Sequence, residues 1–334
     1  MNVHKLSLPA RAGAPRFAWR NLVVPALIVV LCVAMAVWEP RFFSRFNLVN
    51  LARNFAMLAL VSVGQMLVMV VGGIDLSLGA VVALASVASA LTMTGVPALW
   101  PDASPLALVV IGTLAALLAG AAVGAANGAI VAWLKVPPFI STIGVMSMVG
   151  GAALYISNGV PIYGVPDLLT DAVGRALLFG VPVIVWICLA VVLAIGYVMT
   201  QRPLGRHLYA VGGRPEAARA SGIPMTRLLL LAYTTAGVLA ALYGVLVTAR
   251  IGSGQATLGN TTAIESIAAA VVGGVSLQGG SGRVGRVVAA ALFLAVVSNA
   301  LNMARIDSKW QTLALGVVVI VAMLIDVKTS GKAK

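Results

Sequence analysis

Long apolar runs, separated by short polar or Gly/Pro-containing joints, recur along the whole chain. A helix needs about 20 apolar residues to cross the roughly 30 Å hydrocarbon core of a bilayer, and the run lengths favour helices over a barrel. The pattern therefore predicts an all-α integral membrane protein with about ten transmembrane helices. The expected spans are 21–38, 57–72, 76–94, 106–134, 139–157, 179–200, 228–249, 263–275, 287–303 and 310–327.

The same pattern predicts one membrane domain and no separate soluble domain. We expect a cytoplasmic N-terminal tail at 1–20, a transmembrane domain at 21–327 and a cytoplasmic C-terminal tail at 328–334. The first run follows a basic leader but is longer than a usual signal-peptide core, which favours an uncleaved first span. The weakest expected span is 263–275, which is short enough to be a re-entrant segment instead.

The charge distribution predicts the orientation of the spans. Hydrophobic residues make up 61% of the chain and charged residues 9%, with a net charge of +13. With the N-terminus inside, 15 of the 22 Lys and Arg residues fall on the cytoplasmic side, as the positive-inside rule requires. These residues are scattered among the joints, so they indicate membrane orientation and no nucleic-acid partner.

An internal repeat marks two interrupted apolar segments. VVGGIDLSLG at 70–79 matches VVGGVSLQGG at 271–280 in six of ten positions. Paired interruptions of this kind often mark the substrate region of transporters built from repeats. Gly72 and Gly73 are expected to break the helix, because glycine reaches backbone conformations closed to other residues. Asp75 and Ser77 then either cap a new helix or contact substrate or a gate; the sequence leaves both open.

Other polar residues within or beside apolar runs are candidates for a substrate pathway. Glu265 is either a first-turn acidic residue or a cavity-facing group. Asn127 lies beside the stripe Gly120, Gly124 and Gly128, which predicts a close helix approach, and it either joins two helices or lines the pathway. The complete candidate set is Gln65, Gly72, Gly73, Asp75, Ser77, Asn127, Glu265, Gln278 and Asn299.

The sequence offers little catalytic chemistry. It has no GxxxxGK[ST] phosphate-binding loop, so the chain is not expected to hydrolyse ATP by itself. The two histidines, His4 and His207, lie in the tail and in a cytoplasmic connection, and neither a metal cluster nor a nucleophile triad is evident. We expect a non-enzymatic protein with no metal and no cofactor.

The longest cytoplasmic connection, at 201–227, reads QRPLGRHLYAVGGRPEAARASGIPMTR. Within it, Glu216-Ala217-Ala218 precedes Gly222. Proline suits the first turn of a helix and glycine its end, so a short helix from Pro215 to about Ser221 is expected. Such a helix under the membrane is a docking element.

The chain resembles the permease subunits of bacterial ABC importers for ribose and related simple sugars, the ribose/xylose/arabinose type. The resemblance covers nearly the whole chain. It is carried by NLVNLARN at 47–54, GGIDLSLG at 72–79, VPPFISTIG at 136–144, GRHLYAVGGRPEAARASGI at 205–223 and AAAVVGGVSLQGGSGRVG at 268–285.

The resemblance implies a subunit that carries a simple sugar or related polyol across the bacterial inner membrane. It also implies an ATP-binding subunit, an extracytoplasmic sugar-binding protein and a second permease copy as partners, with GGIDLS in the membrane core. The implied coupling residues are Gly205, Arg206, Gly212, Gly213, Glu216, Ala217, Ala218 and Gly222.

An ion-coupled secondary transporter is the alternative, with Asp75 and Glu265 as coupling carboxylates. The docking loop favours the ABC importer, since an ion-driven carrier needs no ATPase dock.

Overall fold

The computed structural model describes residues 23–306 together with residues 310, 313, 316 and 317. Within these residues, seven helices are long and apolar enough to cross a membrane. They are α2 (Arg45–Val70), α3 (Leu78–Leu99), α4 (Pro105–Ala132), α5 (Pro138–Ser157), α7 (Val183–Gln201), α10 (Met225–Ile251) and α12 (Val284–Met303). The predicted all-α membrane class is confirmed.

Two shorter apolar helices, α1 (Val23–Trp38) and α11 (Thr262–Val272), join these seven. The expected tails at 1–20 and 328–334 lie outside the described residues, as does nearly all of the expected span 310–327. The total of about ten spans therefore stays a prediction.

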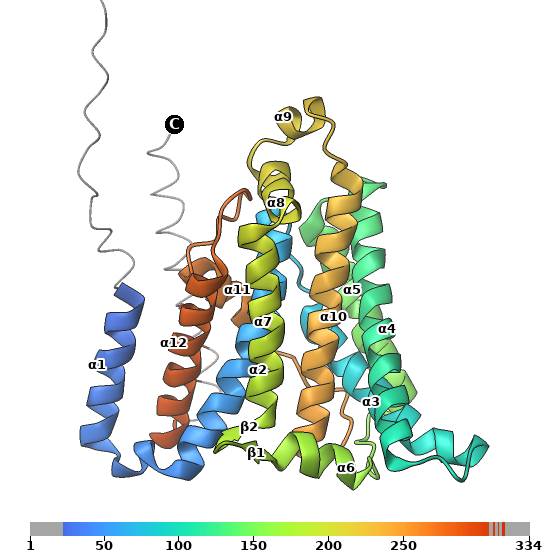
Figure 1. Ribbon diagram of the computed structural model, residues 1–334, viewed down its shortest axis with the longest axis vertical. Coiled ribbons are helices and arrows are strands. Elements are labelled where there is room, and N and C mark those ends of the chain that lie inside the picture. The colour runs from blue at the N-terminus through green and yellow to red at the C-terminus, as the bar shows by residue number, and fades with distance from the viewer. Residues whose placement is uncertain (1–22, 307–309, 311–312, 314–315, 318–334) are drawn as a thin grey trace, which may run out of the picture.

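Short elements mark the two ends of the bundle (Figure 1). One end carries α8 (Pro203–Gly213) and α9 (Pro215–Ala220) and is called the α8–α9 end. The opposite end, called the β1–β2 end, carries the antiparallel hairpin of β1 (Leu177–Leu178) and β2 (Val181–Pro182). The remaining short elements are η2 (Pro40–Phe43), α6 (Asp167–Leu169) and the π-helical turn η3 (Thr170–Arg175).

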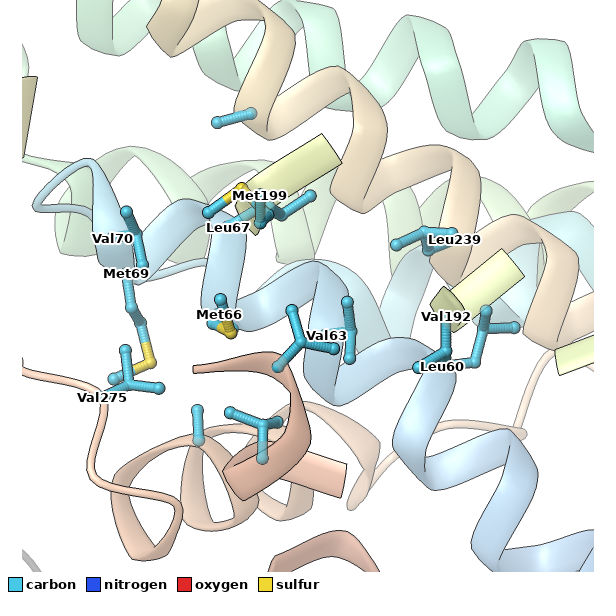
Figure 2. Packing of buried hydrophobic residues seen from close by; sticks show 14 of the residues in the cluster. Leu60, Val63, Met66, Leu67, Met69, Val70, Val192, Met199, Leu239 and Val275 are labelled. Atoms are coloured by element: carbon cyan, nitrogen blue, oxygen red, sulfur yellow. The ribbon is translucent and has the colours of Figure 1, made fainter. Parts of the chain in front are cut away.

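Helix α2 is the centre of the bundle. In its most apolar 18-residue window 83% of residues are buried, against 17% for α4. Figure 2 shows Met66 on α2 near α11, while Val192 of α7 and Leu239 of α10 approach the same helix from other directions. Helix α2 carries the buried polar residues Ser62 and Gln65. Polar side chains within a membrane normally face the bundle interior, which suits this central position.

Helices α4 and α10 pack backbone against backbone along the predicted glycine stripe. A methyl group on Gly124 would collide with the carbonyl oxygen of Tyr233, and one on Gly128 would lie 2.9 Å from the Cα of Leu230. A methyl group on Gly237 of α10 would likewise collide with the carbonyl oxygen of Gly120. The predicted close approach is confirmed, because small residues let two helix axes draw near.

The chain from 252 to 272 connects the two ends but is helical over only part of its length. Gly254 pairs with Ile162, which follows α5, whereas the loop after α11 bonds to α8 through the Tyr209 hydroxyl and Gly282 oxygen, 2.8 Å apart. Helix α11 has 11 residues, so it covers about 16 Å, roughly half a bilayer core. The expected span 263–275 is therefore helical only as far as Val272 and is too short to cross the bilayer as a helix, because the glycine-containing stretches before and after α11 disfavour helix.

Candidate functional site

The first interrupted segment lies between α2 and α3, as the repeat predicted. Helix α2 ends at Val70, and Gly72 adopts a positive φ of 87° that other residues resist. Gly73 lies against Tyr233 of α10, and a methyl group there would collide with the phenol oxygen. Both glycines are therefore required where the chain leaves the helix.

Asp75 is enclosed in the bundle, with 1% of its surface exposed. Its Oδ1 accepts the Ser77 backbone N–H at 2.8 Å, the Ser77 hydroxyl at 2.6 Å and Asn127 Nδ2 at 3.5 Å. Asn127 Nδ2 also donates to Ser77 Oγ at 2.8 Å. The carboxylate thus fixes the interrupted segment against α4, and Asn127 joins two helices.

The capping expectation for Ser77 is wrong. Ser77 occupies the N-cap position of α3, but its hydroxyl makes no bond to a backbone N–H of that helix. Its own backbone is already helical, with φ −78° and ψ −13°, rather than extended as a side-chain cap requires. Asp75 and Asn127 engage the hydroxyl instead.

Gln65 completes this buried cluster from α2. In the amide orientation that satisfies both groups, Gln65 donates to the Asp75 carbonyl oxygen at 3.0 Å and accepts from the Asp75 N–H at 3.2 Å. Gln65, Ser77 and Asn127 are fully buried. Asp75 Oδ2, Asn127 Oδ1 and Tyr233 Oη have no hydrogen-bond partner among the described residues. The cluster ties three helices together and is closed to the surface of this chain.

The other candidate pathway residues lie elsewhere. Asn299 of α12 exchanges two hydrogen bonds with Asn47 near the start of α2, at 2.8 and 3.0 Å. Gln278 is exposed in the loop between α11 and α12, beside α8. Glu265 lies in the first turn of α11, as one interpretation predicted, and its Oε1 accepts from Thr261 Oγ1 at 2.8 Å. The structure does not bring the candidate residues into a single site.

The two repeats share a local turn. In the first, Asp75 Oδ1 accepts the N–H of Ser77; in the second, Ser276 Oγ accepts the N–H of Gln278 at 3.2 Å. Asp75 and Ser276 are equivalent positions in the sequence match. The helix runs one residue further in the second repeat, to Val272, so the positive φ moves to Gly274. The predicted repeat is therefore visible in the backbone as well as in the sequence.

The connection at 201–227 folds into two helices. Helix α9 begins at Pro215 and ends at Ala220, and Gly222 has a positive φ of 72°, which confirms the short helix. Helix α8 was not predicted from the sequence. Its signal is amphipathic: Gly205, Leu208 and Val211 are buried at three-residue spacing, while Arg206 and His207 are exposed.

Helix α8 touches both interrupted segments at what we call the glycine junction. Gly212 lies so close to the Val70 carbonyl oxygen that a methyl group would collide with it. The Gly280 N–H donates to that same oxygen at 2.8 Å. A methyl group on Gly279 would lie 3.0 Å from the Cα atoms of both Gly212 and Gly72. The junction comprises Val70, Gly72, Gly212, Gly279 and Gly280.

A side-chain bond reinforces this junction. The Tyr209 hydroxyl donates to the Gly282 carbonyl oxygen at 2.8 Å. Burial raises the pKa of Tyr209, and the positive charge of Arg283 only partly opposes this shift. The hydroxyl therefore keeps its proton at neutral pH and remains a donor.

Each end of the bundle has a surface hollow. One of about 510 Å³ lies between α8 and α9 and has Arg206, Tyr209 and Arg214 in its wall. Another, of about 1140 Å³, lies at the β1–β2 end between α3, α4 and α6, with Asp167 and Asp171 in its wall. Glu216 and Ala217 are exposed on α9, while Ala218 is buried. Both ends thus offer shaped surfaces, and in the wall of the second hollow Asp171 is paired with Arg175 at 2.9 Å.

Residues 47–325 match the family described as branched-chain amino acid transport system / permease component. The ribose import permease protein RbsC of Haemophilus influenzae is 36% identical over 90% of this chain and 91% of its own length. RbsC of Bacillus subtilis is 33% identical over 91% of each chain. The L-arabinose transport system permease protein AraH of Escherichia coli is 32% identical over 94% of each chain. No solved structure matches the chain. The chain belongs to this family of transport-system permease components.

Proposed function

We propose that this chain is the permease subunit of an ATP-binding cassette importer that carries a simple sugar across the bacterial cytoplasmic membrane. The family description names branched-chain amino acids, but relatives that match the chain almost end to end are named for ribose and arabinose. These relatives support a pentose, hexose or related polyol as the cargo.

The glycine junction is the observation that carries the ATP-driven mechanism. It links α8, outside the apolar spans, to both interrupted segments through backbone contacts. A displacement of α8 and α9 is therefore transmitted to both repeats through backbone contacts, with no flexible side chain between them. The chain has no phosphate-binding loop, so a separate subunit hydrolyses ATP and this chain is not itself an enzyme.

The predicted coupling residues divide into two kinds. Gly205, Gly212 and Gly213 let α8 pack closely on its neighbours, and Gly222 turns the chain after α9. Glu216, Ala217 and Arg206 are exposed and available to an ATP-binding subunit, whereas Ala218 anchors α9. The α8–α9 end is cytoplasmic in this proposal, which agrees with the five arginines between 201 and 227.

The remaining partners complete an importer. An extracytoplasmic sugar-binding protein docks at the β1–β2 end, and a second copy of the permease completes the membrane unit. Gln65, Asp75, Ser77 and Asn127 hold the protein's shape in this proposal rather than touching sugar, because they are buried and bonded to one another.

An ion-coupled carrier is less well supported. A coupling carboxylate must exchange an ion with water during each cycle. Of the two candidate carboxylates, Asp75 is enclosed and holds Ser77 through two short hydrogen bonds, which leaves Glu265 alone in partial contact with the surface.

Uptake by the whole importer tests the cargo. Membrane vesicles that contain this chain with its ATP-binding and sugar-binding partners are given radiolabelled ribose, arabinose or leucine. We expect uptake of a sugar and none of leucine. ATP-dependent leucine uptake without sugar uptake would contradict the proposal.

A further inference from the structure

The chain between α10 and α11 crosses half of the bundle without helical structure. Gly254 pairs with Ile162 near the β1–β2 end, and the Gln255 N–H donates to Ser86 Oγ of α3 at 3.1 Å. Further along, Gly259 packs against Gly79 at the start of α3, so tightly that a methyl group on either would collide with the other's carbonyl oxygen. Residues 252–261 therefore run along α3 from the β1–β2 end to the depth where α11 begins.

This depth lies well inside the membrane. The 11 residues of α11 span about 16 Å from the α8–α9 end, against a hydrocarbon core of about 30 Å. Non-helical backbone is tolerated at such a depth only where protein buries it or where it borders a water-filled cavity. Residues 252–261 must therefore meet one of these two conditions.

Polar side chains on this segment reach the surface of the chain. Thr257, Asn260 and Thr261 are exposed, and Glu265, which bonds to Thr261, is partly exposed. Hydroxyl, amide and carboxylate groups are costly in lipid and at this depth normally face a bundle interior or water. The exposed polar face is thus unsuited to a lipid boundary.

Polar groups continue from Glu265 toward the β1–β2 end. Tyr243 of α10 interacts with Thr262, and both Glu265 and Arg250 act on it electrostatically. Arg250 lies at the end of α10, and its Nη1 donates to Oδ1 of the exposed Asn54 at 2.5 Å. Arg250 forms no ion pair with a carboxylate in the described part of the chain. A row of polar groups therefore leads from the membrane interior to one end.

We propose that Asn54, Arg250, Asn260, Thr261 and Glu265 line the outer half of the substrate pathway and bind sugar hydroxyl groups. This inference rests on the proposed function. The hydroxyl groups of a neutral sugar both donate and accept hydrogen bonds. In the row, the amide and hydroxyl groups can also donate and accept, the guanidinium donates and the carboxylate accepts. Charged partners strengthen such bonds to hydroxyl groups.

Thiol labelling tests whether this face meets water. Cys32 and Cys188 are replaced by alanine, and Asn260→Cys is introduced into the whole importer in vesicles. The control is Leu193→Cys, which lies midway along α7 with 62% of its surface exposed. A positively charged methanethiosulfonate is supplied on both sides of the membrane. We expect Asn260→Cys to react about ten times faster than the control, because only a hydrated thiol ionises readily. Equal rates would overturn the proposal.

A second variant and a second readout keep the test decisive. Thr257→Cys replaces Asn260→Cys if the latter does not accumulate in the membrane. Labelling should reduce ribose or arabinose uptake to background in Thr257→Cys, which lies on the same exposed segment but outside the proposed sugar-binding set, and should leave the Leu193→Cys control unchanged. Fast labelling without any effect on uptake would overturn the sugar-binding role. If the unlabelled cysteine-free parent takes up no sugar, the proposed function fails, while the labelling rates still report whether the face is hydrated.

Discussion

The carbonyl oxygen of Val70 accepts a hydrogen bond from the backbone N–H of Gly280, with 2.8 Å between the two atoms. These residues are 210 positions apart and belong to the two copies of the glycine-containing repeat. Gly212 of α8 packs on the same oxygen. One backbone atom thus joins both repeats to the helix that we assign to coupling.

Gly212→Ala should uncouple transport. The added methyl group collides with the Val70 oxygen, and backbone on both sides leaves little room to relax, so we expect a cost of about 1–3 kcal/mol at the junction. The control is Gly285→Ala near the start of α12, where an added methyl group has no neighbouring atom within 4 Å. ATP hydrolysis stimulated by the loaded binding protein should fall in the first variant and much less in the second. Equal stimulation in both would remove the junction from the coupling route.

Asp75→Asn should cost less than Asp75→Ala. Asparagine keeps an oxygen that accepts the Ser77 backbone N–H, and it removes a buried charge. Alanine leaves that buried N–H unpaired, which costs about 1–3 kcal/mol. The measurement is membrane abundance together with uptake. An ion-coupling role predicts instead that both variants lose transport, and wild-type uptake by the alanine variant would show that the carboxylate is dispensable.

Glu216→Lys and Gly222→Leu should leave the bundle folded but separate it from the ATP-binding subunit. The lysine opposes the dipole at the start of α9, by roughly 0.3–1 kcal/mol. The leucine must adopt the positive φ of 72° at Gly222, at roughly 1–2 kcal/mol. Co-purification with the ATP-binding subunit and stimulated ATP hydrolysis are the measurements. Wild-type values for both variants would exclude this loop as the coupling site.

Gly124→Ala should lower the stability of the bundle itself. Its methyl group meets the Tyr233 carbonyl oxygen across the α4–α10 contact, and overpacking of this kind costs about 1–3 kcal/mol. Gly144→Ala on α5 is the control, because that position has no neighbouring atom within 4 Å. Thermal unfolding in detergent should show a lower midpoint for Gly124→Ala alone. The same midpoint for both variants would contradict the packing account.

The sequence predicted the apolar helices, the break at Gly72 and the short helix α9, because each depends on local chemistry: run length, glycine conformation, or a proline and glycine that delimit a turn. The stripe on α4 was likewise readable, since Gly120, Gly124 and Gly128 fall on one face.

What the sequence did not predict depends on contacts between distant segments. Gln65 and Asn127 look like pathway residues in isolation, and only the fold shows that both are committed to the Asp75 segment. Helix α8 was missed because two of its four buried positions are glycine, which weakens its amphipathic pattern. The polar row from Asn54 to Glu265 joins residues of three helices and of the non-helical segment 252–261, and no local pattern connects them.

Transport by the purified chain in lipid vesicles tests the central claim most directly. The chain is reconstituted alone, or with its ATP-binding subunit and sugar-binding protein, and sugar uptake is measured with ATP or with an imposed proton or sodium gradient. We predict uptake only from the complete assembly with hydrolysable ATP. Uptake by this chain alone, driven by an ion gradient, would contradict the account.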